Sequence, residues 1–227
     1  MNVPQHIVLF PDGNRRWAKD HGLSVEQGYL DGEKRFADFM RWSKNRGVKV
    51  VTVFGFSTEN WNRPPEQVLF LMKIFEKALS KDLDGFMKEG IKVRVIGERE
   101  KLSDSLKKVI ENIETATVGN SAIHLNLAVS YGGKWDIVQA AKKMIQQGIE
   151  PEKITEELFE QHLSTAGQPL PDLVIRAGGE KRLSNFVLWQ AAYAELYFCP
   201  KMWHDFSEED FKAALQEFDA RQRLYGQ

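Results

Sequence analysis

Four loops of this chain combine arginine, glycine and polar side chains in a way that suits phosphate binding. They begin at Asp12, Ser57, Ser130 and Arg176, and each follows a predicted strand. Glycines let backbone N–H groups approach an anion, and arginines supply forked donors that match phosphate oxygens. Because ligands of open parallel sheets bind beyond the carboxyl ends of the strands, we expect these loops to share one site.

The arginines of these loops exceed what one monophosphate needs, so we expect two phosphate-rich substrates. Phosphate would repel the carboxylate of Asp12 unless a divalent cation lay between them, and Mg²⁺ favours carboxylates together with substrate phosphates. Taken alone, Asp12 before a glycine predicts a turn, and Arg182 predicts a solvated charge. Only their joint placement after strands favours a site. The arginines are Arg15, Arg16, Arg63, Arg176 and Arg182.

Other catalytic patterns are weak or missing. The sequence contains neither G-x-x-x-x-G-K-[ST] nor a G-x-G-x-x-G that follows a strand, which argues against an ATPase and against a classical dehydrogenase. His124 lies in the middle of a predicted strand and is interpreted as structural. Nothing in its surroundings marks Cys199 as a nucleophile.

Short apolar runs alternate with helical segments and must position the loops. This alternation predicts right-handed crossovers and a single α/β domain over residues 1–227, with a mostly parallel, six-stranded central sheet surrounded by helices. The strands are expected at 6–10, 48–54, 91–96, 122–129 and 172–176, with another beginning at Glu195. The helices are expected at 32–46, 65–86, 103–117, 134–147, 155–163 and 207–224.

The predicted helix 65–86 carries an apolar stripe on one face. The pattern alone favours a helix packed on the sheet over a wall that binds lipid. Its members recur at steps of three and four residues: Val68, Met72, Phe75, Leu79, Leu83 and Phe86.

Composition narrows the class of protein. The 227 residues include 31 Lys and Arg and 32 Asp and Glu, and this net charge of -1 argues against a nucleic-acid binder. One cysteine excludes an intrachain disulfide and suits a reducing compartment. No apolar run approaches the roughly 18 residues that span a bilayer, and the first residues lack the pattern of a signal peptide. We therefore expect a cytoplasmic protein.

Four long segments of the chain resemble the cis-prenyltransferases, the undecaprenyl diphosphate synthase family. The segments have the family's order and spacing, and the resemblance covers essentially the whole chain. They read HIVLFPDGNRRWA from His6, FGFSTENWNRP from Phe54, NLAVSYGGKWDIVQA from Asn126 and DLVIRAGGEKRLSNFVLWQAAYAELYF from Asp172.

The resemblance implies a magnesium-dependent transferase that adds isopentenyl diphosphate to an allylic diphosphate with Z geometry. It also implies a homodimer and a hydrophobic tunnel. By position, Asp12 is similar to the catalytic, Mg²⁺-binding carboxylate, and Glu195 to a second metal ligand. Asn60 is similar to a catalytic residue that positions the reacting groups. The substrate-binding set implied is Gly13, Asn14, Arg15, Arg16, Trp17, Ser57, Trp61, Arg63, Arg176, Arg182 and Ser184.

With this resemblance, helix 65–86 becomes a candidate tunnel wall. Gly55 is expected to leave room for a growing chain in the upper part of the tunnel, and Ile91 and Ile123 are expected at its floor. A polyprenyl product, expected to be of the undecaprenyl type, would bring the enzyme near a membrane through peripheral contact at most.

Three positions depart from the usual family pattern: Val25, Tyr29 and Leu224. The segment 22–29 is similar to its counterpart in the irregular, short-chain branch, which joins two dimethylallyl diphosphates. Asn14 and the intact loop 57–63 instead resemble the regular enzymes. A short-chain or irregular synthase therefore stays open as an alternative, and a non-catalytic scaffold subunit as a third. Retention of Asp12 and Arg176 argues against the scaffold.

Overall fold

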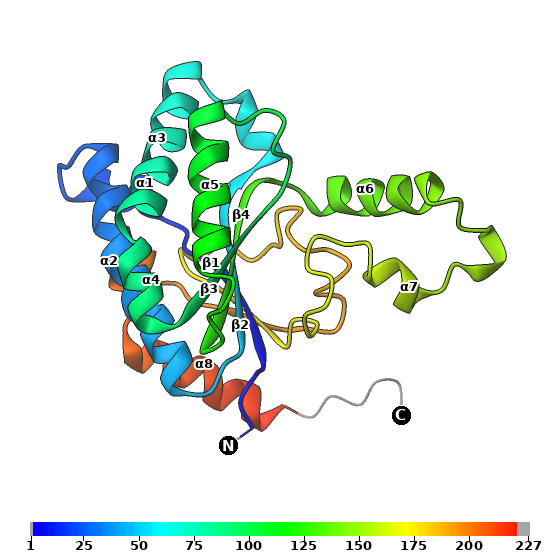
Figure 1. The fold of residues 1–227 in the computed structure, drawn as a ribbon. Coiled ribbons are helices and arrows are strands. Elements are labelled where there is room, and N and C mark those ends of the chain that lie inside the picture. Colours follow the sequence, from blue (N-terminus) through cyan, green and yellow to red (C-terminus); the bar gives the residue numbers. More distant parts are fainter. Residues whose placement is uncertain (1, 222–227) are drawn as a thin grey trace. The chain divides into compact units, whose positions relative to one another are not determined.

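A computed structural model describes residues 2–221 and contains one six-stranded sheet (Figure 1). The strand order is β3-β4-β2-β1-β5-β6, and β1–β2, β1–β5, β3–β4 and β5–β6 pair in parallel. The predicted α/β class with a parallel six-stranded sheet is confirmed. The strands are β1 (His6–Phe10), β2 (Val50–Ser57), β3 (Ile91–Ile96), β4 (Ile123–Tyr131), β5 (Leu173–Arg176) and β6 (Glu195–Phe198).

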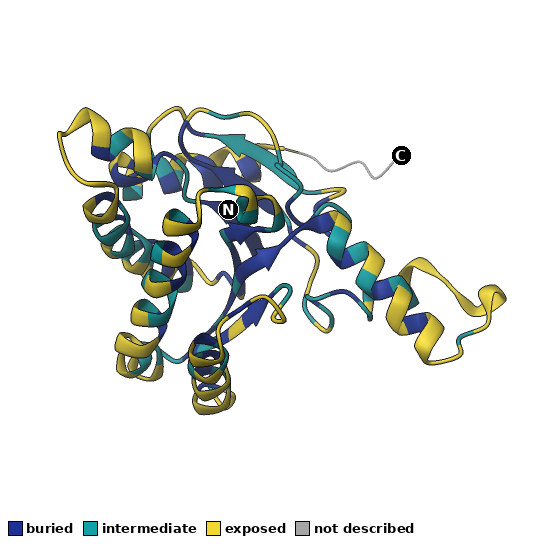
Figure 2. Cartoon of the chain, turned by 90° about the horizontal axis from the view of Figure 1, so that it is seen from above, coloured by how far each residue is buried: buried dark blue, intermediate teal, exposed yellow. Residues whose placement is uncertain are grey.

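The strands are rich in β-branched and apolar residues, although Lys92 and Arg94 alternate with these in β3. Every residue of β1 and β5 is buried, as expected for strands covered on both faces. β1 and β3 have the predicted bounds, whereas β2 begins two residues later and ends three residues later than predicted. Figure 2 shows much of the sheet in dark blue and one strand in teal, since all four residues of β6 are half-buried, with most exposed residues on helices and loops.

The contacts within the chain define two compact units. β2 contributes to both, because Val50 to Val53 belong to the first unit and Phe54 to Ser57 to the second. Of the described residues, unit 1 contains 2–53, 169–182 and 191–221, and unit 2 contains 54–168 and 183–190.

In unit 1, a short helix after β1 packs on a long one. The long helix, α2, begins at Val25, so the predicted start at residue 32 was wrong, and α1 was not predicted. Ser24 caps α2 by accepting a hydrogen bond from the Gln27 N–H. Gly28 lets α1 approach, because a Cβ there would lie 2.9 Å from the Asn14 carbonyl oxygen. The helices are α1 (Asn14–Asp20), α2 (Val25–Asn45), η3 (Trp203–Asp205) and α8 (Glu208–Ala220).

The last helix ends earlier than predicted. It begins with a capping box, in which Ser207 and Asp210 bond each other's backbone N–H groups. α8 stops at Ala220 because Arg221 has an extended backbone, and residues 222–224 of the predicted helix lie outside the described part of the chain.

In unit 2, the predicted helix 65–86 is two helices, so that prediction was wrong. The chain leaves the helical path at Asp82, and α3 and α5 lie side by side (Figure 1). The elements are η1 (Thr58–Asn62), α3 (Pro65–Lys81), α4 (Leu83–Glu89), α5 (Asp104–Ala116), α6 (Gly133–Gln146), η2 (Pro151–Lys153) and α7 (Glu156–Glu160).

The apolar stripe of the predicted helix is buried only in part. Val68, Met72 and Leu79 are buried, whereas Phe75 and Phe86 are half-buried. None of the helices that the structure describes combines the length and the hydropathy that crossing a membrane requires.

Candidate active site

In unit 1, Asp12 and Arg176 meet where β1 and β5 end. Phe10 and Arg176 are register partners, so the residue two places after Phe10 reaches the guanidinium. The Arg176 Nη2 group donates to Asp12 Oδ2 at 2.8 Å, and the guanidinium lies 4.8 Å from the centre of the Phe10 ring. The Arg176 side chain is 5% exposed, whereas that of Asp12 is 38% exposed. The pair thus combines a fixed cation with an accessible carboxylate.

Gly13 and Asn14 shape the turn that follows Asp12. Gly13 has φ +104°, and a Cβ there would lie 3.0 Å from the Met202 side chain, so the turn requires glycine. Its N–H donates to Asp12 Oδ1 at 2.7 Å. The Asn14 amide donates to the Pro11 carbonyl, and its buried Oδ1 finds no partner within the described residues.

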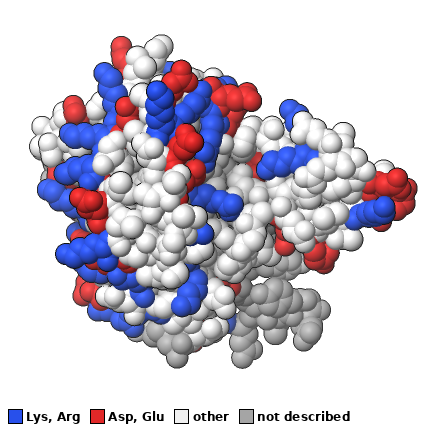
Figure 3. Space-filling model, in the orientation of Figure 1, with Lys and Arg blue, Asp and Glu red and all other residues white. Residues whose placement is uncertain are grey.

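Two arginines of unit 1 share one carboxylate. Arg16 donates to the Gly178 carbonyl at 2.8 Å and lies 3.7 Å from Glu180, while Arg182 lies 2.6 Å from the other Glu180 oxygen. The backbone oxygen of Arg182 also accepts a hydrogen bond from Arg176. Arg15 is exposed. The loop after β5 and the helix after β1 are therefore joined through Glu180. Figure 3 shows that charges of both signs are interspersed on the face drawn.

Trp17 has a different environment from the one that we expected for a substrate-binding side chain. Its ring stacks on His21 and His204, at centroid distances of 4.2 and 4.0 Å, and its indole N–H donates to Asp205. The His204 Nε2–H donates to the Gly28 carbonyl at 2.6 Å, which fixes the neutral tautomer. Burial lowers the pKa of His204, outweighing that hydrogen bond. Both faces of Trp17 are covered, which favours a role in fixing α1.

Glu195 is not brought to Asp12 within one chain. It pairs with Leu173, at the beginning of β5, whereas Asp12 contacts Arg176 at the end of that strand. Glu195 instead forms a 2.6 Å ion pair with Arg221. In the described part of the chain, no three His, Cys, Asp or Glu side chains are placed to hold a metal ion together. Leu224 lies outside the described residues.

In unit 2, Ser57 and Asn60 form a reciprocal capping box around η1. The Asn60 side chain accepts from the Ser57 N–H at 3.1 Å, and the Ser57 side chain accepts from the Asn60 N–H. Trp61 donates from its indole to Ser130 Oγ at 2.8 Å and packs edge-on against Phe56. Arg63 follows η1 with an extended backbone. The structure thus brings together the predicted Ser57, Asn60 and Trp61.

Ser184 belongs to a segment with an uncommon backbone. Ser184, Asn185 and Val187 have φ values of +48°, +60° and +39°, which residues with a Cβ adopt at a cost. Phe186 in the same segment is fully buried and packs edge-on against Phe54 and Tyr131. This packing holds the segment in its conformation.

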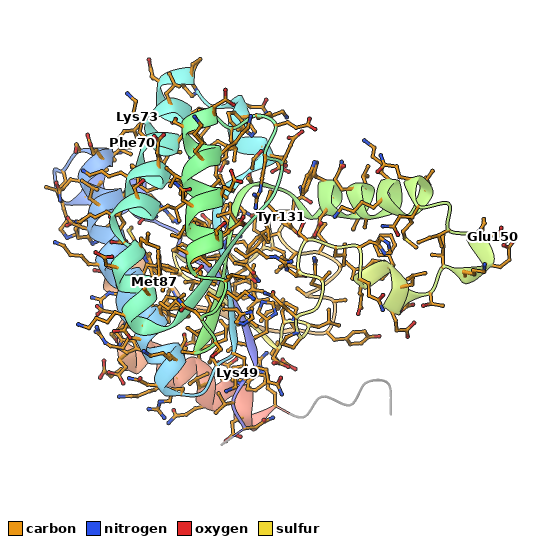
Figure 4. All side chains as sticks on the ribbon, viewed as in Figure 1. Lys49, Phe70, Lys73, Met87, Tyr131 and Glu150 are labelled. Atoms are coloured by element: carbon orange, nitrogen blue, oxygen red, sulfur yellow. The ribbon has the colours of Figure 1, made fainter. Side chains whose placement is uncertain are left out.

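Two residues that form several hydrogen bonds, Asn185 and Asp136, are not among the site residues predicted from the sequence. The Asn185 amide donates to Glu59 on η1 at 2.7 Å, and Asp136 collects hydrogen bonds from Tyr131, Gln190 and Ser164. Figure 4 marks Tyr131, where β4 leads into α6. Asn185 directly follows the predicted Ser184, and Glu59 lies in the predicted loop 57–63. Their positions in the sequence therefore could have indicated a role near the site.

Gly55 is half-buried and lies close to β4 and α3. A Cβ there would lie 2.8 Å from the Ala128 carbonyl oxygen and 3.2 Å from Phe75 Cε1. Ile91 and Ile123 are register partners and both are buried. The missing side chain at Gly55 therefore serves the close approach of α3 to β2.

Comparisons with known proteins agree in one family. The prenyltransferase family model, described as undecaprenyl diphosphate synthase, matches residues 10–226. A chloroplastic dehydrodolichyl diphosphate synthase of Solanum lycopersicum is 44% identical over 99% of this chain and 74% of its own. A farnesyl-diphosphate-specific ditrans,polycis-undecaprenyl-diphosphate synthase of Escherichia coli K12 is 41% identical over 98% of this chain and 89% of its own.

Solved structures give the same result. Lavandulyl diphosphate synthase from Lavandula x intermedia, solved with dimethylallyl diphosphate, has a TM-score of 0.94 and 38% identity over 99% of both chains. A probable undecaprenyl diphosphate synthase from Campylobacter jejuni has a TM-score of 0.85 and 33% identity over 100% of both chains.

Proposed function

This chain belongs to the undecaprenyl diphosphate synthase family and is a prenyltransferase, and from that premise we propose that it joins isopentenyl diphosphate to an allylic diphosphate. The product is a Z-configured polyprenyl diphosphate of the undecaprenyl type, and residues 1–227 form one cis-prenyltransferase domain. The observation that carries the proposal is the ion pair of Asp12 with the buried Arg176. A fixed cation beside an accessible carboxylate suits a diphosphate that binds through a divalent cation.

The donor set fits Mg²⁺. Sites for this ion commonly use one or two carboxylates together with substrate phosphates and water. The exposed part of Asp12 offers such a carboxylate, held by the Gly13 N–H and by Arg176. When bound, the ion would neutralise charge that develops on the departing diphosphate. Within one chain Glu195 does not join Asp12, so its role as a second ligand is proposed from the resemblance alone.

The arginines bind the two diphosphates, and the η1 loop orients the reacting groups. Arg176, Arg182 and Ser184 bind isopentenyl diphosphate, while Arg15 and Arg16, with Gly13 and Asn14, bind the allylic diphosphate. Asn60 and Ser57 orient the reacting groups, with Trp61 and Arg63 beside them. Fixed cations stabilise the charge of the leaving diphosphate more effectively than water, since they need no reorganisation during the reaction.

The apolar residues protect an allylic cation from water. The face of α3 around Phe75 is half-buried and forms the wall of the proposed hydrophobic tunnel. The isopentenyl double bond attacks the cation, and loss of a proton completes the condensation. A diphosphate oxygen is the proposed acceptor of that proton.

The assembly and the location follow from the family rather than from this chain alone. We propose a homodimer in the cytoplasm, with peripheral membrane contact at most. Sedimentation of the purified chain tests the dimer, and a monomer at micromolar concentration would contradict it.

A product assay tests the activity. Labelled isopentenyl diphosphate and Mg²⁺ are incubated with dimethylallyl, geranyl or farnesyl diphosphate, and the products are separated by chain length. A ladder that ends in long polyprenols is expected. Branched products from dimethylallyl diphosphate alone would instead support the irregular alternative. Two observations are the reason for testing that alternative: the likeness to lavandulyl diphosphate synthase and the departures at Val25 and Tyr29. Absence of turnover with every primer would support the third alternative, a non-catalytic scaffold subunit.

A further inference from the structure

Asn185 lies where three segments of unit 2 meet. Its Oδ1 accepts from the Lys134 N–H at 2.9 Å, and its carbonyl accepts from the Gly133 N–H at 2.5 Å. Because Oδ1 faces a backbone N–H, the amide orientation is fixed and Nδ2 must be the group that points to Glu59. That amide donates to Glu59 Oε1 at 2.7 Å. Asn185 therefore joins the beginning of α6 to η1.

The geometry leaves little freedom at this junction. A Cβ on Gly132 would lie 2.6 Å from Thr58 Oγ1 and 2.9 Å from Asn185 Nδ2. A side chain at Gly132 would thus have to displace the Thr58 hydroxyl and the Asn185 amide, the group that bonds to Glu59. The left-handed backbone of Asn185, at φ +60°, turns its side chain to this place, and asparagine tolerates that conformation better than most residues.

Glu59 is held as a carboxylate in this arrangement. Burial raises the pKa of Glu59, but hydrogen bonds from Asn185, from its own backbone and from Ser57 and Thr58 outweigh it, so the pKa lies below its usual value. A charge-assisted hydrogen bond of this kind is stronger than one between neutral groups. Glu59 directly precedes Asn60, so the bond acts on the η1 backbone next to the capping box.

From these contacts we infer that Asn185 and Glu59 are positioning residues, whose hydrogen bond couples the segment that carries Ser184 to the loop that carries Ser57 and Asn60. The inference rests on the proposed function, in which those two segments bind and orient the substrates. Neither Asn185 nor Glu59 needs to touch substrate. Their bond keeps both segments in the binding conformation, which raises the apparent affinity of the site.

Five variants, among them the single variant Asn185→Ala, separate the bond from its surroundings. Asn185→Asp keeps the acceptor for Lys134 but sets a carboxylate against Glu59. Glu59→Gln keeps an acceptor for the Asn185 amide, whereas Glu59→Ala removes it. Asn185→Ala/Glu59→Ala completes a double-mutant cycle with the two alanine single variants. Gln168→Ala is the matched control, since it breaks another amide pair in unit 2, the one between Asn126 and Gln168.

The first measurement is backbone hydrogen exchange of the free protein. Asn185→Asp is expected to raise exchange in 57–63, and Glu59→Ala to raise it in 183–190, about five- to tenfold in each case. Glu59→Gln and Gln168→Ala should change exchange in these segments less than twofold. Exchange that rises only in the substituted segment overturns the inference.

The second measurement is steady-state turnover. Asn185→Asp and Glu59→Ala should raise KM for isopentenyl diphosphate about five- to tenfold, Glu59→Gln should restore it, and the double variant should be no worse than the poorer single variant. Additive losses overturn the inference. Because exchange needs no substrate, coupled exchange without turnover in the unmodified chain would defeat the proposed function alone. Turnover without coupled exchange would defeat the inference alone.

Discussion

Two aspartates of this chain have the same side chain and opposite surroundings. Asp136, in unit 2, is 1% exposed and accepts from Tyr131, Gln190 and both the backbone N–H and the hydroxyl of Ser164. Asp12, in unit 1, accepts from the Gly13 N–H and from Arg176, and 38% of its side chain is exposed.

The difference shows how a structural carboxylate can be told from a functional one. A carboxylate offers about four acceptor positions. Asp136 uses that number of donors within the protein, so no position remains for a ligand. Asp12 keeps exposed surface on which a cation could bind. The number of donors already bound, rather than the residue type, therefore predicts where chemistry can occur.

The largest expected effect is on turnover, from removal of Asp12. Asp12→Ala should lower kcat at least about 10³-fold, because the group that binds the cation next to the leaving diphosphate is lost. The free energy of unfolding should fall by only about 1–2 kcal/mol, since the lost ion pair with Arg176 is partly exposed. Product formation and urea unfolding measure the two quantities. Retention of a tenth of the activity would contradict the comparison.

Substitution of Asp136 should have the opposite result, with a large loss of stability and a small effect on turnover. Asp136→Asn turns an NH₂ group toward donors and should lower the free energy of unfolding by about 3 kcal/mol. Turnover per folded molecule should change far less than in Asp12→Ala. Thermal unfolding together with activity at low temperature tests this, and a stable but inactive Asp136→Asn would place Asp136 in the chemistry instead.

His6 extends the comparison to pH. It is fully buried, its Nδ1–H donates to the Pro169 carbonyl, and its Nε2 accepts from Thr52. Burial lowers its pKa from 6.5 to about 4, although the Pro169 carbonyl and Asp172 act in the other direction. The neutral ring is therefore favoured on folding. This contribution is complete above pH 6.5 and is lost as the pH falls toward 4, by about 3 kcal/mol.

Unfolding free energies from pH 7 to 4 measure that loss. His6→Gln serves as the control, since it cannot gain the proton. A variant that loses stability over this range as steeply as the parent chain would show that His6 is not the group responsible.

The smallest expected effect lies at Glu180. Its pairs with Arg16 and Arg182 are partly exposed, so Glu180→Gln should change the free energy of unfolding by less than about 0.5 kcal/mol. Removing its charge makes the loop more positive, and KM for isopentenyl diphosphate should fall about two- to fivefold. Steady-state kinetics at low salt measures the change. A rise in KM would mean that Glu180 fixes the arginines more than it neutralises them.

Much of the fold could be predicted because local signals coincide with tertiary ones. β1 is an apolar run and β3 alternates apolar with charged residues, and a glycine follows each strand within three residues. The break at Asp82 was missed since neither glycine nor proline marks it and the apolar period continues into α4. The predicted start of α2 at residue 32 is too late, although Ser24 is a residue type that commonly caps a helix. Gly28 and Gly32 lie inside this helix because other residues approach them closely.

The sequence predicted which loops form the site, but not which of their side chains contact each other. Arginines after strands indicate anion binding, whereas the contact between Asp12 and Arg176 joins residues 164 positions apart. The hydrogen bond between Asn185 and Glu59 depends on the left-handed backbone of Asn185. No local sequence pattern predicts that conformation. Glu195 came from the resemblance alone.

β6 is an edge strand, and this position has a consequence for aggregation. Its outward backbone groups could pair with a strand of another molecule. β6 has only four residues and is followed within two residues by Pro200, and Arg221 donates to the Leu196 carbonyl at 3.4 Å. A short strand, a proline and an occupied acceptor leave few groups for intermolecular pairing. This edge therefore protects the newly synthesised chain against sheet extension between molecules.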